Sequence, residues 1–268
     1  MEITMEKTKL EEILEKAEMK GKYYDGNKSK NSALSNYAYC LVELVGGEGV
    51  LFVYNADLTT ACGFRSEVME WRGGMTTFIL DIAKTRAYLK PFDGEVRLLV
   101  GDFLTITDGD EIAKLPLVTE HPSHDMIRLI SSRFLKVVDP IKDYNEEEDA
   151  VPPTISFGKT EYDCHVQISE RVLSDAIKAC DVVDLARYKI DATEEKVLVS
   201  SERSVTDSFV YEIGDCVLPD SEATMEFTGD ILKFINGSKQ IHMFLKDESP
   251  LVLVTDDSML VKAPYLAR

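Results

Sequence analysis

The residues with side chains suited to chemistry are few and widely separated in this 268-residue chain. His121 and His124 have a spacing that could place two imidazoles on one metal ion, but a proline lies between them and no further Cys or His pair accompanies them. Asp108, Asp110 and Glu111 could serve acid–base chemistry or hold a cation, yet the surrounding ITDGDEI is typical of a turn between strands. We expect neither group to be a catalytic or metal site.

Other motifs that would indicate an enzyme are also missing from the sequence. Gly46, Gly47 and Gly49 separate two strand-like runs and do not open a helix, so they indicate a hairpin loop rather than a phosphate-binding loop. The sequence has no G-x-S-x-G, Walker or dinucleotide-binding motif. The five cysteines are odd in number and widely spaced, which argues against disulfides and zinc. We therefore predict a protein that is not an enzyme and binds no cofactor.

The amino-acid composition restricts which partners, such as nucleic acids or membranes, the chain can bind. Hydrophobic residues make up 44% of the chain, enough for a packed core, and the net charge is -18. A uniformly acidic surface would repel DNA phosphates and anionic membranes, so a nucleic-acid role requires positive charge gathered in one place. The charged first 18 residues do not have the pattern of a signal peptide, and no apolar run approaches the ~20 residues that span a bilayer. We expect an intracellular protein with no membrane partner.

The positioning elements occur twice along the chain. Residues 78–82, FILDI, match residues 227–231, FTGDI, and a short helical segment and then paired strands follow both. Each half also contains an amphipathic helix near its start, KLEEILEKAEM in the first and ERVLSDAIKACDVV in the second. The strands are rich in Val, Ile, Leu, Phe and Tyr. This pattern predicts an α+β fold in which each half is a mainly antiparallel sheet covered by two helices.

The two halves are separated by a segment of different composition. Residues 118–154 contain Pro140, Pro152 and Pro153 and the acidic run 146–149, which together indicate an extended, exposed connector. Within it, residues 126–135 have the spacing of a short extra helix. We therefore predict an N-terminal domain over 1–117, a connector over 118–154 and a C-terminal domain over 155–268.

The second half resembles a known family. PPTISFGKTEYDCHVQISERVLSDAIKACDVVD, FTGDILKFINGSKQIHMFLKDESPLVLVTDD and the closing LVKAPYLAR are similar to the C-terminal domain of archaeal proliferating cell nuclear antigen (PCNA), a DNA sliding clamp. The likeness is good over 151–268, whereas the first half matches mainly in element order. The sequence departs from the family in its longer connector, in Ala263-Pro264 preceding Tyr265, and around residues 70–74. A divergent clamp, from a virus, a plasmid or a second gene copy, fits this pattern.

The resemblance implies two tandem clamp domains whose sheets lie outside and whose helices line the inner face of a ring around DNA. Segments 8–22, 81–90, 169–183 and 229–239 contain 11 Lys/Arg and 9 Asp/Glu, whereas the remainder contains 19 and 39, so positive charge is enriched in the helices. DNA binding is expected to be independent of base sequence and sensitive to salt. The cations expected to face DNA are Lys16, Lys20, Lys84, Arg86, Lys90, Arg171, Lys178, Lys233 and Lys239.

The same resemblance implies a processivity factor for DNA replication and repair, found in the cytoplasm near the nucleoid of an archaeon. Its partners would be double-stranded DNA, further copies of itself in a trimeric ring, a clamp loader, and a polymerase, nuclease or ligase carrying a short peptide motif. The residues expected to bind that peptide are Tyr54, Leu58, Val137, Val138, Ile141, Pro250, Ala263, Pro264 and Tyr265. The alternatives are a clamp-like checkpoint or decoy protein, a monomeric regulator of replication, and a small α+β hydrolase.

Overall fold

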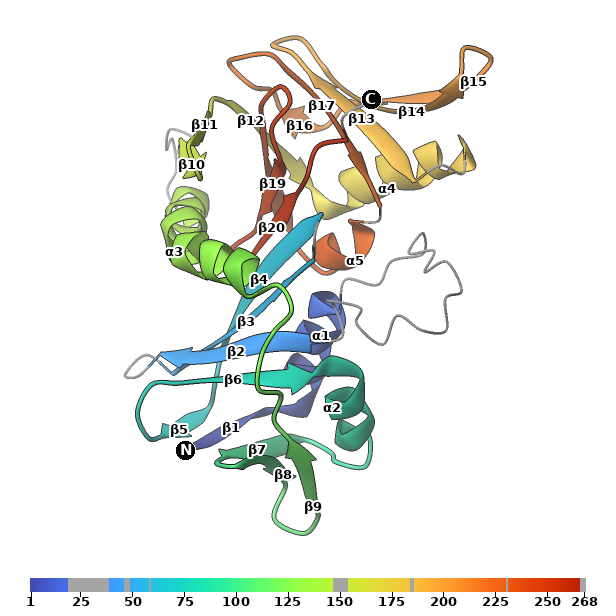
Figure 1. Cartoon of the computed structure of the whole chain (residues 1–268). Coiled ribbons are helices and arrows are strands. Elements are labelled where there is room, and N and C mark those ends of the chain that lie inside the picture. The colour runs from blue at the N-terminus through green and yellow to red at the C-terminus, as the bar shows by residue number, and fades with distance from the viewer. Residues whose placement is uncertain are drawn as a thin grey trace. The chain divides into compact units, whose positions relative to one another are not determined.

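The computed structural model describes residues 1–18, 39–45, 49–57, 59–146, 154–183, 186–229 and 231–265. The chain divides into two compact units (Figure 1). The described residues up to Ser131 form the first unit, and those from Ser132 onward form the second. None of the helices in these residues is long and apolar enough to cross a membrane.

The first unit contains two antiparallel arrays of strands and two helices. One array pairs in the order β5-β1-β7-β8-β9 and the other in the order β4-β3-β2-β6. The strands are β1 (Glu2–Glu6), β2 (Tyr39–Val45), β3 (Val50–Ala56), β4 (Thr60–Glu67), β5 (Glu70–Arg72), β6 (Thr76–Asp81), β7 (Glu95–Val100), β8 (Phe103–Thr107) and β9 (Ile112–Pro116). The helices are α1 (Lys7–Ala17) and α2 (Ile82–Leu89).

The second unit repeats this arrangement. Its strands pair in the orders β16-β12-β18-β19-β20 and β15-β14-β13-β17, beside a small hairpin of β10 and β11. The strands are β10 (Ile155–Phe157), β11 (Thr160–Tyr162), β12 (Cys164–Ser169), β13 (Arg187–Ala192), β14 (Val197–Ser204), β15 (Asp207–Ile213), β16 (Cys216–Val217), β17 (Ala223–Thr228), β18 (Gln240–Leu245), β19 (Leu251–Val254) and β20 (Ser258–Lys262). The helices are α4 (Glu170–Cys180), the short η2 (Asp181–Val183) and α5 (Leu232–Ile235). The predicted α+β fold with an internal duplication is therefore confirmed.

Local sequence explains where the helices begin. Asp81 ends β6, and its carboxylate accepts a hydrogen bond from the backbone N–H of Lys84 at 2.9 Å, which caps α2. Ser169 ends β12 in the second unit, and its hydroxyl accepts one from Val172 N–H at 3.4 Å, which caps α4. Both helices therefore begin directly where a strand ends, at a residue suited to capping.

Helix α5 is shorter than the sequence predicted. The expected helix extended to Lys239, but α5 ends at Ile235. Asn236 leaves the helical conformation, and Gly237 has a positive φ of 83°, a conformation that favours glycine. Lys239 therefore follows the helix instead of belonging to it.

The predicted connector is helical over much of its length. Helix α3 runs from His124 to Glu146 and includes Pro140, so the prediction of an extended segment is wrong over these residues. Val137, Val138 and Ile141 form an apolar stripe at helical spacing and are almost completely buried. Burial of this stripe on both sides of Pro140 outweighs the loss of one backbone donor. The rest of the acidic run and Pro152 and Pro153 lie outside the described residues.

Candidate functional site

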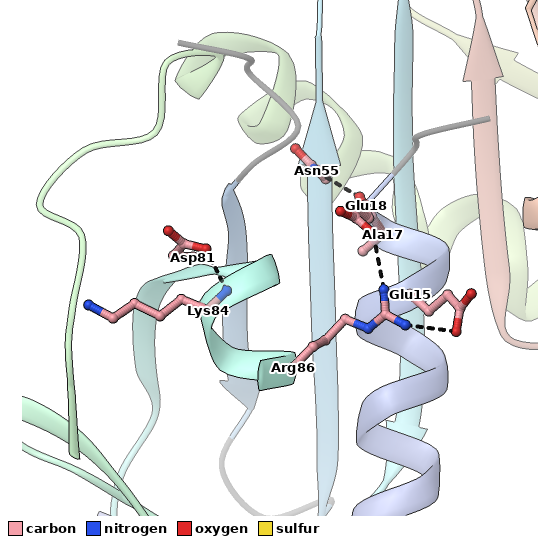
Figure 2. A network of polar contacts seen from close by, with 7 residues as sticks. All are labelled: Glu15, Ala17, Glu18, Asn55, Asp81, Lys84 and Arg86. Carbon is pink, nitrogen blue, oxygen red and sulfur yellow. Dashed lines mark hydrogen bonds and ion pairs between the residues drawn. The ribbon is translucent and has the colours of Figure 1, made fainter. Parts of the chain in front are cut away.

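The two helices of the first unit are joined by an arginine that was predicted to face DNA. Arg86 extends from α2 to α1, where its Nη1 donates to Glu18 Oε2 at 3.1 Å and its Nη2 donates to Glu15 Oε2 at 3.0 Å (Figure 2). The Arg86 side chain is 32% exposed and that of Glu18 is 13% exposed. The negative charges of two carboxylates thus offset the positive charge of Arg86. We therefore interpret Arg86 mainly as a residue that links α2 to α1.

A buried polar network holds the C-terminal end of α1. Asn55 on β3 donates its side-chain amide N–H to Ala17 O at 2.7 Å (Figure 2). His121 Nδ1 accepts a hydrogen bond from Ser123 N–H at 3.0 Å, so the ring proton lies on Nε2. From there it is directed at Tyr39 O, 2.9 Å away, and at Asn55 Oδ1, 3.2 Å away. Burial lowers the pKa of His121, which favours this neutral form.

The hydrogen bonds of His121 bear on whether His121 and His124 could bind a metal ion together. Both ring nitrogens of His121 already bond to groups of the chain, whereas His124 is exposed. Within the described residues, no cluster of three or more His, Cys, Asp or Glu side chains could hold a metal ion. The pair therefore has a structural explanation, in which His121 fixes the segment that leads into α3.

The remaining predicted cations of the first unit differ in their environments. Lys16 on α1 forms an ion pair with Glu12 one turn earlier, with 2.9 Å between Nζ and Oε1. Lys84 and Lys90 are exposed and have no ion pair within the part of the chain that the structure describes. Lys20 lies outside that part. Among the predicted DNA-facing lysines that the structure describes in this unit, those without an ion pair are therefore Lys84 and Lys90, on α2 and directly after it.

The second unit places its predicted cations on and beside α4 and α5. Arg171 and Lys178 are exposed on α4, opposite its buried stripe, and Arg171 Nε lies 4.0 Å from Asp175 Oδ2. Lys233 is half-buried on α5, and Lys239 is exposed beyond it. The helices of the second unit therefore also present several cations to solvent.

The predicted peptide-binding residues do not share one environment. Tyr54, Val137, Val138 and Ile141 are buried, with exposures of 2% or less, so the prediction of an exposed connector is wrong at the three α3 residues. Their spacing along α3 places Val137, Val138 and Ile141 on the buried side of the helix. Leu58 lies outside the described residues. Pro250, Ala263 and Pro264 are half-buried, and Tyr265 is 40% exposed.

Tyr265 is nevertheless held in a defined position. Its backbone N–H donates to Glu226 O at 2.7 Å, and the guanidinium of Arg187 lies 4.2 Å from its ring centroid. Arg187 Nη2 in turn pairs with Glu226 Oε2 at 2.6 Å. Sequence reasoning missed Arg187 and Glu226, because they become neighbours only through the pairing of β13 with β17.

A second missed feature is a pair of buried histidines. His165 on β12 and His242 on β18 stack with ring centroids 5.1 Å apart, and His165 Nε2 lies 2.9 Å from His242 Nδ1. Tyr144 of α3 contacts both rings edge-on. Burial lowers the pKa of His165 to about 4 and, with the neighbouring His165, the pKa of His242 to about 3. The neutral pair is therefore part of the core.

Solved structures of sliding clamps match the chain over its whole length. DNA polymerase III subunit beta from Pseudomonas aeruginosa gives a TM-score of 0.70 at 14% identity, covering 100% of this chain and 66% of that chain. The beta subunit from Thermotoga maritima gives 0.69 at 14%, with 100% and 66% covered. A. fulgidus PCNA, solved with the C-terminal region of FEN-1, gives 0.67 at 14%, with 100% and 99% covered. The chain has the sliding-clamp fold.

These matches establish the fold, and they do not distinguish an archaeal clamp from a bacterial one. No protein-family model and no curated protein matches the sequence. This chain spans about two thirds of the bacterial beta subunits and nearly all of the A. fulgidus protein. Because bacterial and archaeal clamps match with similar scores, the archaeal assignment remains a prediction.

Proposed function

We propose that this clamp is a DNA polymerase processivity factor, a non-catalytic ring that encircles duplex DNA and tethers replication and repair enzymes to it. The observation that carries this proposal is the two-fold repeat of one strand order, matched to solved clamps along 100% of the chain. A closed ring stays on DNA without strong contacts. Tethering then raises the effective concentration of an enzyme at the template.

The proposed DNA contacts lie on helices of both units or directly after them. Lys84, Lys90, Lys178 and Lys239 are exposed and free of ion pairs within the described residues, so they are the strongest candidates to meet phosphates. Lys16 and Arg86 contribute less, because nearby glutamates offset their charges. A chain with a net charge of -18 then binds DNA weakly, without base preference and with strong salt dependence.

Three copies are proposed to close the ring, as the likeness to PCNA implies. Strand β9 ends one array of the first unit, and β15 ends one array of the second. Ile112 on β9 is 68% exposed and Val210 on β15 is 59% exposed, so each edge has apolar surface to bury. Joining β9 of one copy to β15 of the next is a head-to-tail contact that generates a ring when its rotation closes.

Partner enzymes are proposed to bind through a short peptide near the C-terminal segment. A. fulgidus PCNA was solved with the C-terminal region of FEN-1, a precedent for such binding on this fold. On this chain, Tyr265 with Ala263, Pro264 and Pro250 remain candidates because part of their surface is exposed. The buried Tyr54 and the α3 residues are not surface contacts of that peptide.

Primer extension on a singly primed circular template, with the polymerase and loader of the source organism, tests the function. The clamp should lengthen the products, and a Lys84→Glu/Lys90→Glu variant should do so less while keeping the same mass in solution. Equal product lengths with and without the clamp would contradict the processivity role. A mass of one chain at all concentrations would instead support a monomeric regulator.

A further inference from the structure

The first unit has a cleft of 490 Å3 on the exposed face of its β5-β1-β7-β8-β9 sheet. The opposite face supplies core residues such as Ile3, Leu98 and Leu104, all at most 1% exposed. Two large apolar side chains remain outside the core in the cleft, because Leu99 is 37% exposed and Phe103 is 56% exposed. An apolar surface retained between polar walls is typical of a binding site.

Strand register places charges at defined positions around these apolar residues. Arg72 lies opposite Glu2, Glu2 opposite Leu99, Leu99 opposite Thr105, and Thr105 opposite Lys114. The five residues thus form one row across the sheet, and all of them line the cleft. A cation stands at each end of the row, about 19 Å apart for four steps of about 4.8 Å. That distance is the length of about six extended residues.

The acidic residues of the cleft leave the two end cations available. Glu2 has its own partner in Arg97, with Oε1 and Nη1 3.7 Å apart. Asp102 lies beside Phe103 at the β7–β8 turn. Arg72 has only a marginal contact with Glu70 at 4.0 Å, and both side chains are mostly exposed. Lys114 is exposed and has no ion pair within the described residues.

One wall of the cleft comes from the segment in which this sequence departs from the clamp family. Residues 70–72 form the edge strand β5, which pairs with β1 and brings Arg72 to the cleft. Gly73 ends this strand with a φ of 130°, and a Cβ there would lie 3.1 Å from Met1 Cγ. The positive φ favours glycine at this position, directly after β5.

We propose that this cleft binds a short extended segment of another protein, in which aromatic or aliphatic side chains lie between acidic residues. The apolar side chains pack on Leu99 and Phe103, and the acidic residues pair with Arg72 and Lys114. Electrostatic complementarity provides specificity, because the chain as a whole has a net charge of -18 and repels an acidic segment elsewhere. The site goes beyond the processivity role and does not require the chain to form a ring.

Fluorescence anisotropy with two labelled probe peptides tests this assignment on the full chain. One probe has the sequence Asp-Glu-Leu-Phe-Glu-Asp, and the other has lysine in place of every acidic residue. We expect the acidic probe to bind at least about tenfold more tightly. Phe103→Ser and Lys114→Glu should each weaken it by about tenfold. The matched control Val217→Ser, at a 48% exposed position of the second unit, should leave binding unchanged.

Three results would overturn the assignment. The first is the absence of binding by the acidic probe, and the second is equal affinity of the wild-type chain for both probes. The third is a lower mass in solution for Phe103→Ser than for Val217→Ser, which would identify the face as a contact between copies. Circular dichroism of all variants shows whether they are folded, which is expected because Phe103 and Lys114 lie on the surface.

Discussion

The helix pairs of the two units occupy corresponding places in a repeated fold, yet they are stabilised differently. In the first unit, α1 and α2 are linked by charge, because Arg86 bonds to both Glu15 and Glu18. In the second unit, α4 packs through a stripe that includes Leu173 and Ile177, both fully buried. The same strand order is therefore compatible with two different sets of helix contacts. Because α1 also buries an apolar stripe that includes Leu10 and Leu14, loss of apolar volume should destabilise either unit, whereas we expect ionic strength to act mainly on the first.

The largest expected effect is on the second unit. Ile177→Ala removes buried methyl and methylene groups and should lower the free energy of unfolding by about 2–5 kcal/mol, independently of salt. Urea unfolding followed by circular dichroism measures this change. Trp71, the single tryptophan, reports on the first unit by fluorescence and should shift less. Val182→Ala, at a 69% exposed position, is the matched control and should stay within about 0.5 kcal/mol.

Buried histidines make the stability of both units depend on pH, and the second unit contains two of them. The pKa values of His165 and His242 in the folded chain, about 4 and about 3, lie below the ordinary 6.5. The unfolded chain therefore binds protons that the folded chain excludes, so their contribution is complete above pH 6.5 and declines as the pH falls toward those values. The slope is at most about 1.4 kcal/mol per pH unit for each imidazole. Burial lowers the pKa of His121 too, so the first unit also loses stability in acid.

Urea titrations between about pH 7.5 and about pH 5 measure this slope. The His165→Gln/His242→Gln variant should show a flatter profile by circular dichroism than the wild-type chain. The matched control His124→Gln replaces an exposed histidine and should change the slope less than the double variant does. Equal slopes in the double variant and the wild-type chain would show that the pair is not kept neutral by the fold.

The charged link of the first unit should have a smaller effect. Arg86→Ala leaves Glu15 and Glu18 without their shared cation and should lower stability by about 1 kcal/mol, since the group is partly exposed. Trp71 fluorescence in urea measures the change, which should shrink in high salt. Arg97→Ala, which breaks the single 3.7 Å pair with Glu2, is the control and should cost less. A salt-independent loss would contradict the electrostatic explanation.

The smallest effect on folding is expected from the exposed lysines of α2. Lys84→Glu/Lys90→Glu should change stability by no more than about 0.5 kcal/mol. The slope of log affinity for DNA against log salt should decrease by about 0.9 for each phosphate contact removed. DNA binding measured over a salt series gives this slope. The same double change at Lys142 and Lys159, two exposed lysines outside the proposed wall, should leave it unaltered.

Much of this fold could be predicted from the sequence, because periodicity is a local property. The stripes of α1 and α4 and the repeated strand, helix and strand pair were readable from residues close together in the chain. Helix α3 was only partly predicted, since Pro140 and the acidic run favoured an extended segment while the apolar spacing of residues 126–135 favoured a helix. Burial of the apolar side chains of α3, such as Val137 and Ile141, favours the helix.

The candidate sites were less predictable, because they depend on register and on contacts between elements. The Arg86 bridge joins residues 68 and 71 positions apart. The His165–His242 pair and the row from Arg72 to Lys114 require knowledge of which strands pair and in what register. No local pattern contains that information, so the sequence identified the charged residues but not their partners.

Retention on nicked circular DNA, after loading by the clamp loader of the source organism, tests whether the chain forms a closed ring. The protein should stay on the circle in high salt and be released once a restriction enzyme cuts the DNA, because a closed ring slides off free ends. A complex of three 30.1-kDa chains should be seen in the same preparation by light scattering. Equal retention on cut and uncut DNA, or a single 30.1-kDa chain at every concentration, would contradict it.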